Sequence, residues 1–254
     1  KNPNITYTTH LSLHKHEDTQ YDMLIIDEIH LLSDAQIDAC DRVMDGTPAV
    51  LGLTGTLSSW TESELDQRLG LPVICSYSID QAIQEGVIVD YQITVLKVPL
   101  DNQVVQEVKG KARTEKKHFD ACTWVIDKLD KQGQNTMMLR LKRMRIIQNS
   151  IAKLALTRQL LQKYNQERVL VFCGTTDMAD SLGIPSHHSK SGDKEAFKKF
   201  AEGEGNHMAV VKIGNTGVTY KPLNKVVLNY FDSNAENLAQ KVNRCMAMEY
   251  NTPD

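Results

Sequence analysis

Two adjacent carboxylates, Asp27 and Glu28, directly follow the apolar run of residues 23–26, and His30 lies two positions further on. Such a run is typical of a buried parallel strand whose carboxyl end opens on a ligand site. Magnesium prefers oxygen ligands and keeps several waters, so one or two carboxylates there would hold it. The second acid can orient or deprotonate a water that attacks a phosphate. For these two residues alone, a simple helix cap is the alternative interpretation.

A hydroxyl-containing tripeptide, Thr54-Gly55-Thr56, gives the acidic pair its context. Residues 34–44 are expected to form a helix and residues 49–53 a strand, so the tripeptide follows the next strand along the chain. Because parallel strands open at the same edge of a sheet, its hydroxyls can hydrogen-bond the acidic segment. The tripeptide alone is a plain turn. One strand after the acidic pair, it favours a site that hydrolyses a phosphate bond.

Basic residues gather in three further segments. Gln240 and Arg244 are one helical turn apart and would share a helix face, where an Arg can stabilise charge on a transferring phosphoryl group. An expected long helix carries four basic residues within six positions, namely Arg140, Lys142, Arg143 and Arg145. These groups, and a basic stretch over residues 109–117, can neutralise nucleic-acid phosphates. Solvated helix faces and a mobile loop are the alternative interpretation.

Strand and helix signals alternate at both ends of the chain, whereas the middle is helical. Strands are expected at residues 4–9, 21–27, 49–53, 91–98, 168–172, 208–211 and 225–229, and helices at 34–44, 61–69, 79–85, 118–131 and 136–164. The expected fold class is α/β, with two parallel-sheet domains and a helical, basic insertion between them. The predicted division is into residues 1–88, 89–165 and 166–254.

The composition is ordinary for a soluble globular protein, with 254 residues, 41% of them hydrophobic and 24% charged. A net charge of −3 gives no general affinity for nucleic acid, so such contacts must come from local basic patches. No segment approaches the roughly 18 apolar residues of a membrane span. The five cysteines are scattered and form no C-x-x-C pair, which argues against a disulfide framework or a cysteine zinc site and fits a reducing cytoplasm.

The ordered set of segments resembles the superfamily 2 helicases and translocases, in which two RecA-like domains clamp ATP between them. Residues 27–30 match that family's second motif, of the D-E-x-H type, and residues 54–56 are similar to the third, which couples hydrolysis to nucleic-acid binding. Residues 169–175 resemble the fourth motif and residues 214–217 the fifth. Gln240 and Arg244 match part of the sixth motif, while Thr8 and Thr9 correspond to a phosphate-contacting segment of the first domain.

This resemblance implies a role for each matched residue. The ATPase residues would be Asp27, Glu28, His30, Gln240 and Arg244, with Asp27 and Glu28 as magnesium ligands, and Thr54, Gly55 and Thr56 would couple their state to nucleic acid. Nucleic-acid contact is expected at Thr8, Thr9, Cys173, Gly174, Thr175, Asn215, Thr216 and Gly217, besides the four basic residues of the long helix. The implied cofactors are ATP and Mg²⁺.

Within the superfamily, the overall sequence, including residues 85–93, is most similar to phage helicases that anneal strands and migrate branched DNA, with restriction-type translocases a close second. The expected partner is therefore branched or duplex DNA, with RNA as an alternative and other replication or recombination proteins as further candidates. No membrane partner is expected. The expected compartment is the cytoplasm of a bacterium or of an infected host.

The sequence departs from the family pattern in three places. It contains no G-x-x-x-x-G-K-[S/T] loop, which would cradle phosphates and would precede Lys1, so the chain is expected to be a fragment with an incomplete first domain and to be inactive alone. Ala247 stands where the sixth motif has a second Arg, a residue worth about 10³–10⁵ in rate. Asn243 replaces that motif's Gly, and Thr219 replaces the fifth motif's Asp.

Three functions fit these observations. The leading hypothesis is an ATP-dependent DNA helicase or translocase that unwinds or remodels branched nucleic acid. The second is a catalytically inactive nucleic-acid-binding protein with the same fold, which the missing loop and Ala247 would explain. The third is the motor subunit of a restriction-type complex. Whether Ala247 is natural or engineered stays open.

Overall fold

The structure is a computed structural model that describes residues 2, 4–108, 110–190, 194–211, 220–221, 223–230, 238 and 241. The chain divides into two compact units, residues 1–78 and 79–254. Within the described residues, every helix is too short or too polar to pass through a lipid bilayer. The three-part division inferred from the sequence stays a prediction.

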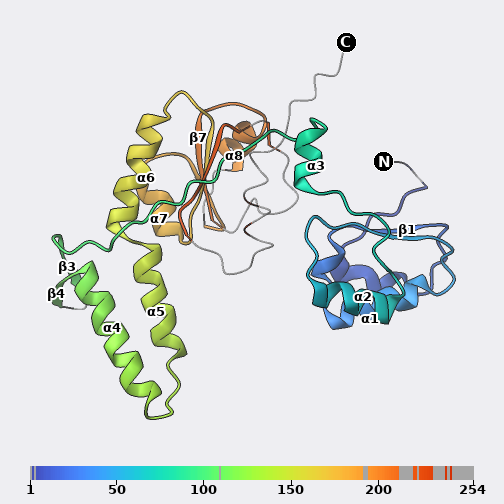
Figure 1. The fold of residues 1–254 in the computed structure, drawn as a ribbon, viewed down its shortest axis with the longest axis horizontal. Helices are drawn as coiled ribbons and strands as arrows, with labels where there is room; N and C mark the ends of the chain where they lie inside the picture. Colours follow the sequence, from blue (N-terminus) through green and yellow to red (C-terminus); the bar gives the residue numbers. More distant parts are fainter. Residues whose placement is uncertain are drawn as a thin grey trace. The chain divides into compact units, whose positions relative to one another are not determined.

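The first unit is built on two short parallel strands. Strand β1 (Leu24–Ile26) pairs with β2 (Val50–Gly52), and helix α1 (Asp34–Met44) connects them (Figure 1). Helix α2 (Ser59–Leu69) and the 3-10 helices η1 (His10–His16) and η2 (Ile29–Leu31) complete the unit. The core is formed by the buried residues Leu13, Ile26, Ile29, Ile37, Cys40, Val43, Leu65 and Leu69. The strand, helix and strand expected between residues 21 and 53 are thus confirmed.

The second unit contains a sheet of four parallel strands in the order β6–β7–β5–β8. Their bounds are β5 (Val169–Phe172), β6 (Ser186–His187), β7 (His207–Val210) and β8 (Lys225–Leu228). Because successive side chains of a strand point to opposite faces, β5 serves two cores. Val169 and Val171 belong to one cluster, and Leu170 and Phe172 belong to another.

Helices cover both faces of this sheet. Helices α6 (Ile151–Lys163) and α7 (Thr176–Ser181) contribute Leu161 and Met178 to the first cluster, whereas α8 (Lys194–Ala201) contributes Phe200 to the second (Figure 1). Parallel strands with helices on both faces, together with a helical segment before them, confirm the predicted α/β class.

A helical hairpin precedes the sheet. Helices α4 (Glu115–Asp130) and α5 (Met137–Gln148) pack side by side (Figure 1). An antiparallel pair that the sequence pattern did not reveal, β3 (Val105–Val108) and β4 (Lys111–Thr114), leads into α4. The short helix α3 (Ile79–Gln84) begins the unit and matches the helix expected there.

Three expected elements are wrong. Residues 4–9 and 91–98 form no strand, because neither segment pairs with another strand in the described part of the chain, and Val95 is left 83% exposed. A β-rich pattern alone does not form a strand unless a partner satisfies its backbone groups. The single helix expected over residues 136–164 is interrupted, so that α5 ends at Gln148 and α6 begins at Ile151.

A buried carboxylate explains that interruption. Glu115, the first residue of α4, is 5% exposed and accepts hydrogen bonds from the backbone N–H of Ile151 and the hydroxyl of Ser150, each at 3.0 Å. It also accepts from the backbone N–H of Asp101 at 2.8 Å. Ser150 is the N-cap of α6, and an anion is favoured at a helix N-terminus. Glu115 therefore joins the start of the hairpin to the start of α6.

Replacing Glu115 by Ala is expected to lower the free energy of unfolding of the second unit by roughly 3 kcal/mol, because three donors lose a charged partner in a buried position. Urea unfolding followed by Trp124 fluorescence, in a Trp60→Phe background, would measure it. The matched control is Glu107→Ala, at an exposed acid of β3, with an expected change within about 0.5 kcal/mol. Equal effects of the two substitutions would contradict this role of Glu115.

Candidate functional site

The carboxyl ends of β1 and β2 bring two predicted segments together. The register pairs Ile26 with Gly52, the last residues of the two strands. Beyond them, the backbone N–H of Leu53 donates to Ile26 O at 2.9 Å, and that of Ile29 donates to Leu53 O at 3.0 Å. Residues 27–30 and 53–56 therefore lie side by side at one edge of the first unit, as parallel pairing requires.

The backbone at the acidic pair is unusual. Glu28 has φ 49° and ψ 46°, and it is the one non-glycine residue with positive φ among the described residues. This left-handed conformation costs about 1–2 kcal/mol for an L-residue. The backbone N–H of Glu28 donates to Asp27 Oδ1 at 3.0 Å. Such strain persists where the surrounding structure enforces it, and it is often found at functional sites.

A threonine hydroxyl joins the acidic segment to the Thr-Gly-Thr segment. Thr54 Oγ1 lies 2.7 Å from His30 Nδ1 and donates to Thr56 O at 2.6 Å. Because its single proton is used there, the hydroxyl accepts from His30 Nδ1–H and from the Thr56 backbone N–H, which lies 3.2 Å away. The His30 side chain is 1% exposed, and Glu28 Oε2 lies 3.4 Å from the same Nδ1. The predicted contact between these two segments is thus present.

The carboxylates fit a magnesium ion held mainly by water. Asp27 is exposed, and the buried Oε2 of Glu28 makes no hydrogen bond in the structure. No group of three or more His, Cys, Asp or Glu residues suited to a metal occurs in the described part of the chain. That excludes an all-protein cage there but suits an ion that needs one or two carboxylates. Asp27 and Glu28 are the residues that would hold it.

Two residues that the sequence did not single out support this edge. His10 donates from Nε2 to Asp27 O at 2.9 Å, and Thr9, one of the predicted nucleic-acid contacts, precedes it at the start of η1. Gly52 lies against Ile29, where a Cβ at residue 52 would be 2.7 Å from the Ile29 Cδ1. No local signal identifies a lone histidine 17 residues upstream, or one strand glycine, as part of a site. Thr8 and Thr9 are both exposed.

In the second unit, Cys173, Gly174 and Thr175 follow the end of β5. Cys173 is 1% exposed, and burial raises the pKa of its thiol to about 12. Its side chain is therefore a neutral part of the core, so that of these three residues Gly174 and Thr175 reach the surface. Lys153 of α6 lies nearby and donates to Asn229 O at 2.9 Å, and burial lowers the pKa of its amine.

The end of α5 packs on this loop. A Cβ at Gly174 would lie 3.1 Å from the Gln148 side chain, and the Thr175 hydroxyl donates to Asn149 Oδ1. The helix that carries the four predicted basic contacts thus ends against the loop that carries three more. Of the other predicted residues, Asn215, Thr216, Gly217, Gln240 and Arg244 lie outside the described residues.

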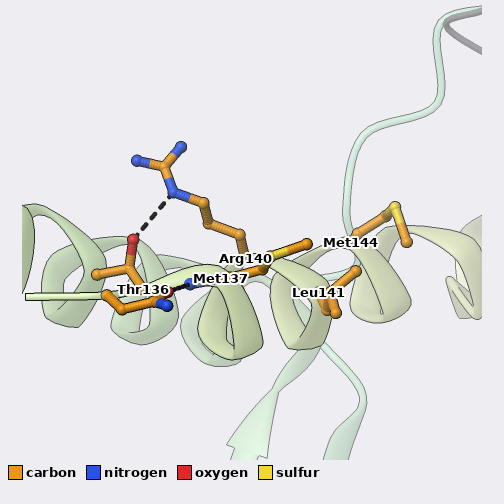
Figure 2. A pocket seen from close by; sticks show the side chains of 6 residues that line it. Thr136, Met137, Arg140, Leu141 and Met144 are labelled. Carbon is orange, nitrogen blue, oxygen red and sulfur yellow. Dashed lines mark hydrogen bonds between the residues drawn. The ribbon is translucent and has the colours of Figure 1, made fainter.

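The structure places the four basic residues of α5 in different surroundings. Arg140 pairs with Asp130 and donates to the Thr136 hydroxyl at 3.0 Å, beside a hollow of about 480 Å³ edged by three apolar side chains of α5 (Figure 2). Arg143 turns toward α4, with its guanidinium 5.6 Å from the Phe119 ring centroid. Lys142 and Arg145 instead line a second hollow, of about 250 Å³.

Residues 152–248 match the family of helicase conserved C-terminal domains. The DNA 3'-5' translocase XPB2 of Sulfurisphaera tokodaii is 23% identical over 234 residues, which cover 84% of this chain and 53% of that protein. The chain thus spans about half the length of this curated relative. Together these two matches support a relationship to the helicases and translocases of superfamily 2.

Two solved helicase structures are also similar over most of the chain. The Hef helicase domain of Pyrococcus furiosus is 13% identical with a TM-score of 0.47, and the match covers 94% of this chain and 73% of that one. S. cerevisiae Dbp5, bound to RNA and ADP BeF3, is 12% identical with a TM-score of 0.49, and the match covers 88% of this chain and 49% of that one.

The close approach of Gly52 to Ile29 can be tested by adding one methyl group. Gly52→Ala should displace Ile29, which lies between Glu28 and His30, and lower the free energy of unfolding of the first unit by about 1–3 kcal/mol. Gly55→Ala is the matched control, since its Cβ would have no atom within 4 Å and should change that value by less than about 0.5 kcal/mol.

Urea unfolding of both variants would be followed by Trp60 fluorescence in a Trp124→Phe background, because Trp60 lies in α2 of the first unit. A Gly52→Ala protein as stable as the Gly55→Ala protein would show that the close contact with Ile29 does not restrict residue 52.

Proposed function

We propose that this chain is part of an ATP-dependent DNA helicase or translocase that acts on duplex or branched DNA. The observation that carries the proposal is the hydrogen-bonded joining of His30 to Thr54 at the edge that also presents Asp27 and Glu28. The helicase C-terminal match over residues 152–248 supports the same function from the other end of the chain. DNA as the substrate is supported by the relative named a DNA 3'-5' translocase.

The acidic pair would divide two tasks. Asp27, which is exposed, would hold the magnesium ion of ATP directly or through water. When bound, that ion neutralises charge on the phosphates. Glu28 would orient the attacking water and accept its proton, since its Oε2 makes no hydrogen bond in the structure. Gln240 and Arg244, outside the described residues, would supply the further groups that stabilise charge on the phosphoryl group.

The hydrogen bond between His30 and Thr54 offers a way for nucleic-acid binding to affect ATP hydrolysis. Any movement of residues 54–56 changes the partner of His30 Nδ1, and the same nitrogen lies 3.4 Å from Glu28 Oε2. Nucleic acid bound near Thr8 or Thr9 would then affect hydrolysis by shifting this hydrogen bond. RNA as the nucleic acid is an alternative within the same proposal. Replication or recombination proteins are further candidate partners.

Glu28→Gln is expected to lower nucleic-acid-stimulated ATP hydrolysis by at least about 100-fold, because an amide cannot accept the water's proton. ATP binding should be retained. Hydrolysis and binding of a fluorescent ATP analogue would be measured in the full-length protein. The control is Asp22→Asn, at an exposed acid before β1, which should leave both values unchanged. Unchanged turnover in the Glu28→Gln protein would overturn the proposed function.

Thr54→Val should separate hydrolysis from its stimulation. Valine keeps the shape but removes the hydroxyl that links His30 to Thr56, so basal hydrolysis should persist while stimulation by DNA falls by up to about tenfold. The assay compares hydrolysis with and without duplex DNA, and Thr19→Val serves as an exposed threonine control. Equal loss of basal and stimulated hydrolysis would argue that Thr54 supports the site itself rather than its coupling.

A nucleic-acid-binding protein without turnover is the second candidate. It is favoured by Ala247 at the place of an arginine that would stabilise charge on the phosphoryl group. DNA binding by the full-length protein with no measurable hydrolysis would select this candidate.

A further inference from the structure

A hollow of about 250 Å³ lies at the base of the helical hairpin, within the second unit. Its walls come from β3, α4 and α5, and the lining residues are Gln106, Glu115, His118, Lys142, Arg145, Ile146 and Asn149. Three lining residues of α5 and its C-cap Asn149 are spaced by three, one and three positions, so they continue along one face of the helix. This face differs from the apolar one that holds Arg140 (Figure 2).

The hollow has more cations than anions. Lys142 and Arg145 form no ion pair within the described residues, unlike Arg140, which pairs with Asp130. Arg113 also acts on His118, because burial, followed by the charges of Lys142 and Arg113, lowers the pKa of that imidazole. Like charges held close together repel one another, and an anion placed among them would remove that repulsion.

The single acid of the hollow is already engaged. Glu115 accepts from Ile151 N–H through Oε1, and from Asp101 N–H and the Ser150 hydroxyl through Oε2. Both of its oxygens therefore face donors of the surrounding backbone and α6 cap. Asn149 is partly engaged as well, because its Oδ1 accepts from the Thr175 hydroxyl. That bond leaves the amide N–H groups of Asn149 as donors.

We propose that this hollow binds one phosphate of a DNA backbone, with Lys142 and Arg145 neutralising it and the Asn149 amide donating to it. The proposal rests on the proposed function for its choice of DNA as the source of the phosphate. The groups are of the kind that contact phosphate oxygens in protein–DNA complexes, and they read no sequence. The hydrogen bond from the Thr175 hydroxyl to Asn149 links this phosphate site to the loop of Gly174 at the end of β5.

The test compares charge removal inside and outside the hollow. Lys142→Gln and Arg145→Gln are the test variants, and Lys131→Gln is the matched control, because Lys131 is an exposed cation at the end of α4 on the same hairpin. Binding of a labelled DNA duplex with a single-stranded arm is measured by fluorescence anisotropy at several salt concentrations. Lys142→Arg, which keeps the charge, should bind nearly as the unaltered chain does.

Together, the two substitutions should reduce the slope of log affinity against log salt by about 0.9, the value for one phosphate, and should weaken binding about eightfold at 0.1 M salt, whatever the DNA sequence. Each single variant should show part of this change. The Lys131→Gln chain should keep the original slope. Slopes for Lys142→Gln and Arg145→Gln that equal the Lys131→Gln slope would overturn the proposal. The proposal would also be overturned if Lys142→Gln and Arg145→Gln left DNA affinity unchanged while the hollow bound inorganic phosphate.

Failure of this inference can be told from failure of the proposed function. Loss of DNA affinity in the two variants, in a protein that hydrolyses no ATP, supports the phosphate site and removes the motor function. The opposite outcome is also possible. If DNA stimulates hydrolysis normally and Glu28→Gln abolishes it, but Lys142→Gln and Arg145→Gln leave DNA affinity unchanged, the motor function is retained and the phosphate site is rejected. Circular dichroism spectra matching that of the unaltered chain would show that the exposed substitutions leave the fold intact.

Discussion

The parallel pairing of β1 with β2 is the constraint on which the candidate site depends. It stops at Ile26 and Gly52, and the two hydrogen bonds beyond that point turn residues 27–30 toward residues 53–56. Glu28 has a left-handed backbone conformation at this edge, and Ile29 packs directly over Gly52, where a side chain would not fit without a shift. The Thr54 hydroxyl then meets His30 at 2.7 Å. A short strand pair thus brings an acid, a histidine and a threonine into one connected group.

In the second unit, the Glu115 carboxylate has a comparable role. By accepting from Ser150 and Ile151, it ends the long helical segment, caps α6 and ties the hairpin to the sheet domain. The contacts of Gln148 and Asn149 with the loop after β5 add to that junction. A buried anion at a helix N-terminus is stable only where such donors satisfy it. The helical hairpin and the loop of Gly174 are consequently held against one another by direct contacts.

The surroundings of each basic residue of α5 decide whether its charge is already paired within the chain. Arg140 is neutralised by Asp130, and Arg143 lies over an aromatic ring of α4. Lys142 and Arg145 face a hollow whose acid is occupied by backbone donors. Four residues that look equivalent in the sequence thus differ in how readily they can meet an external phosphate. The same principle separates Cys173, whose thiol is buried, from its neighbours Gly174 and Thr175.

The sequence by itself determined the α/β class, the strands at residues 24–26 and 50–52, and the identity of the acidic and Thr-Gly-Thr segments. These follow from apolar runs and residue chemistry, which are local properties. Only the tertiary structure decided that residues 4–9 and 91–98 pair with no strand in the described part of the chain, that α5 and α6 are separate, and that His10 and Gly52 support the acidic pair. Each of these depends on a partner distant in sequence, such as Glu115 for Ser150, and no local pattern encodes which partner will be there.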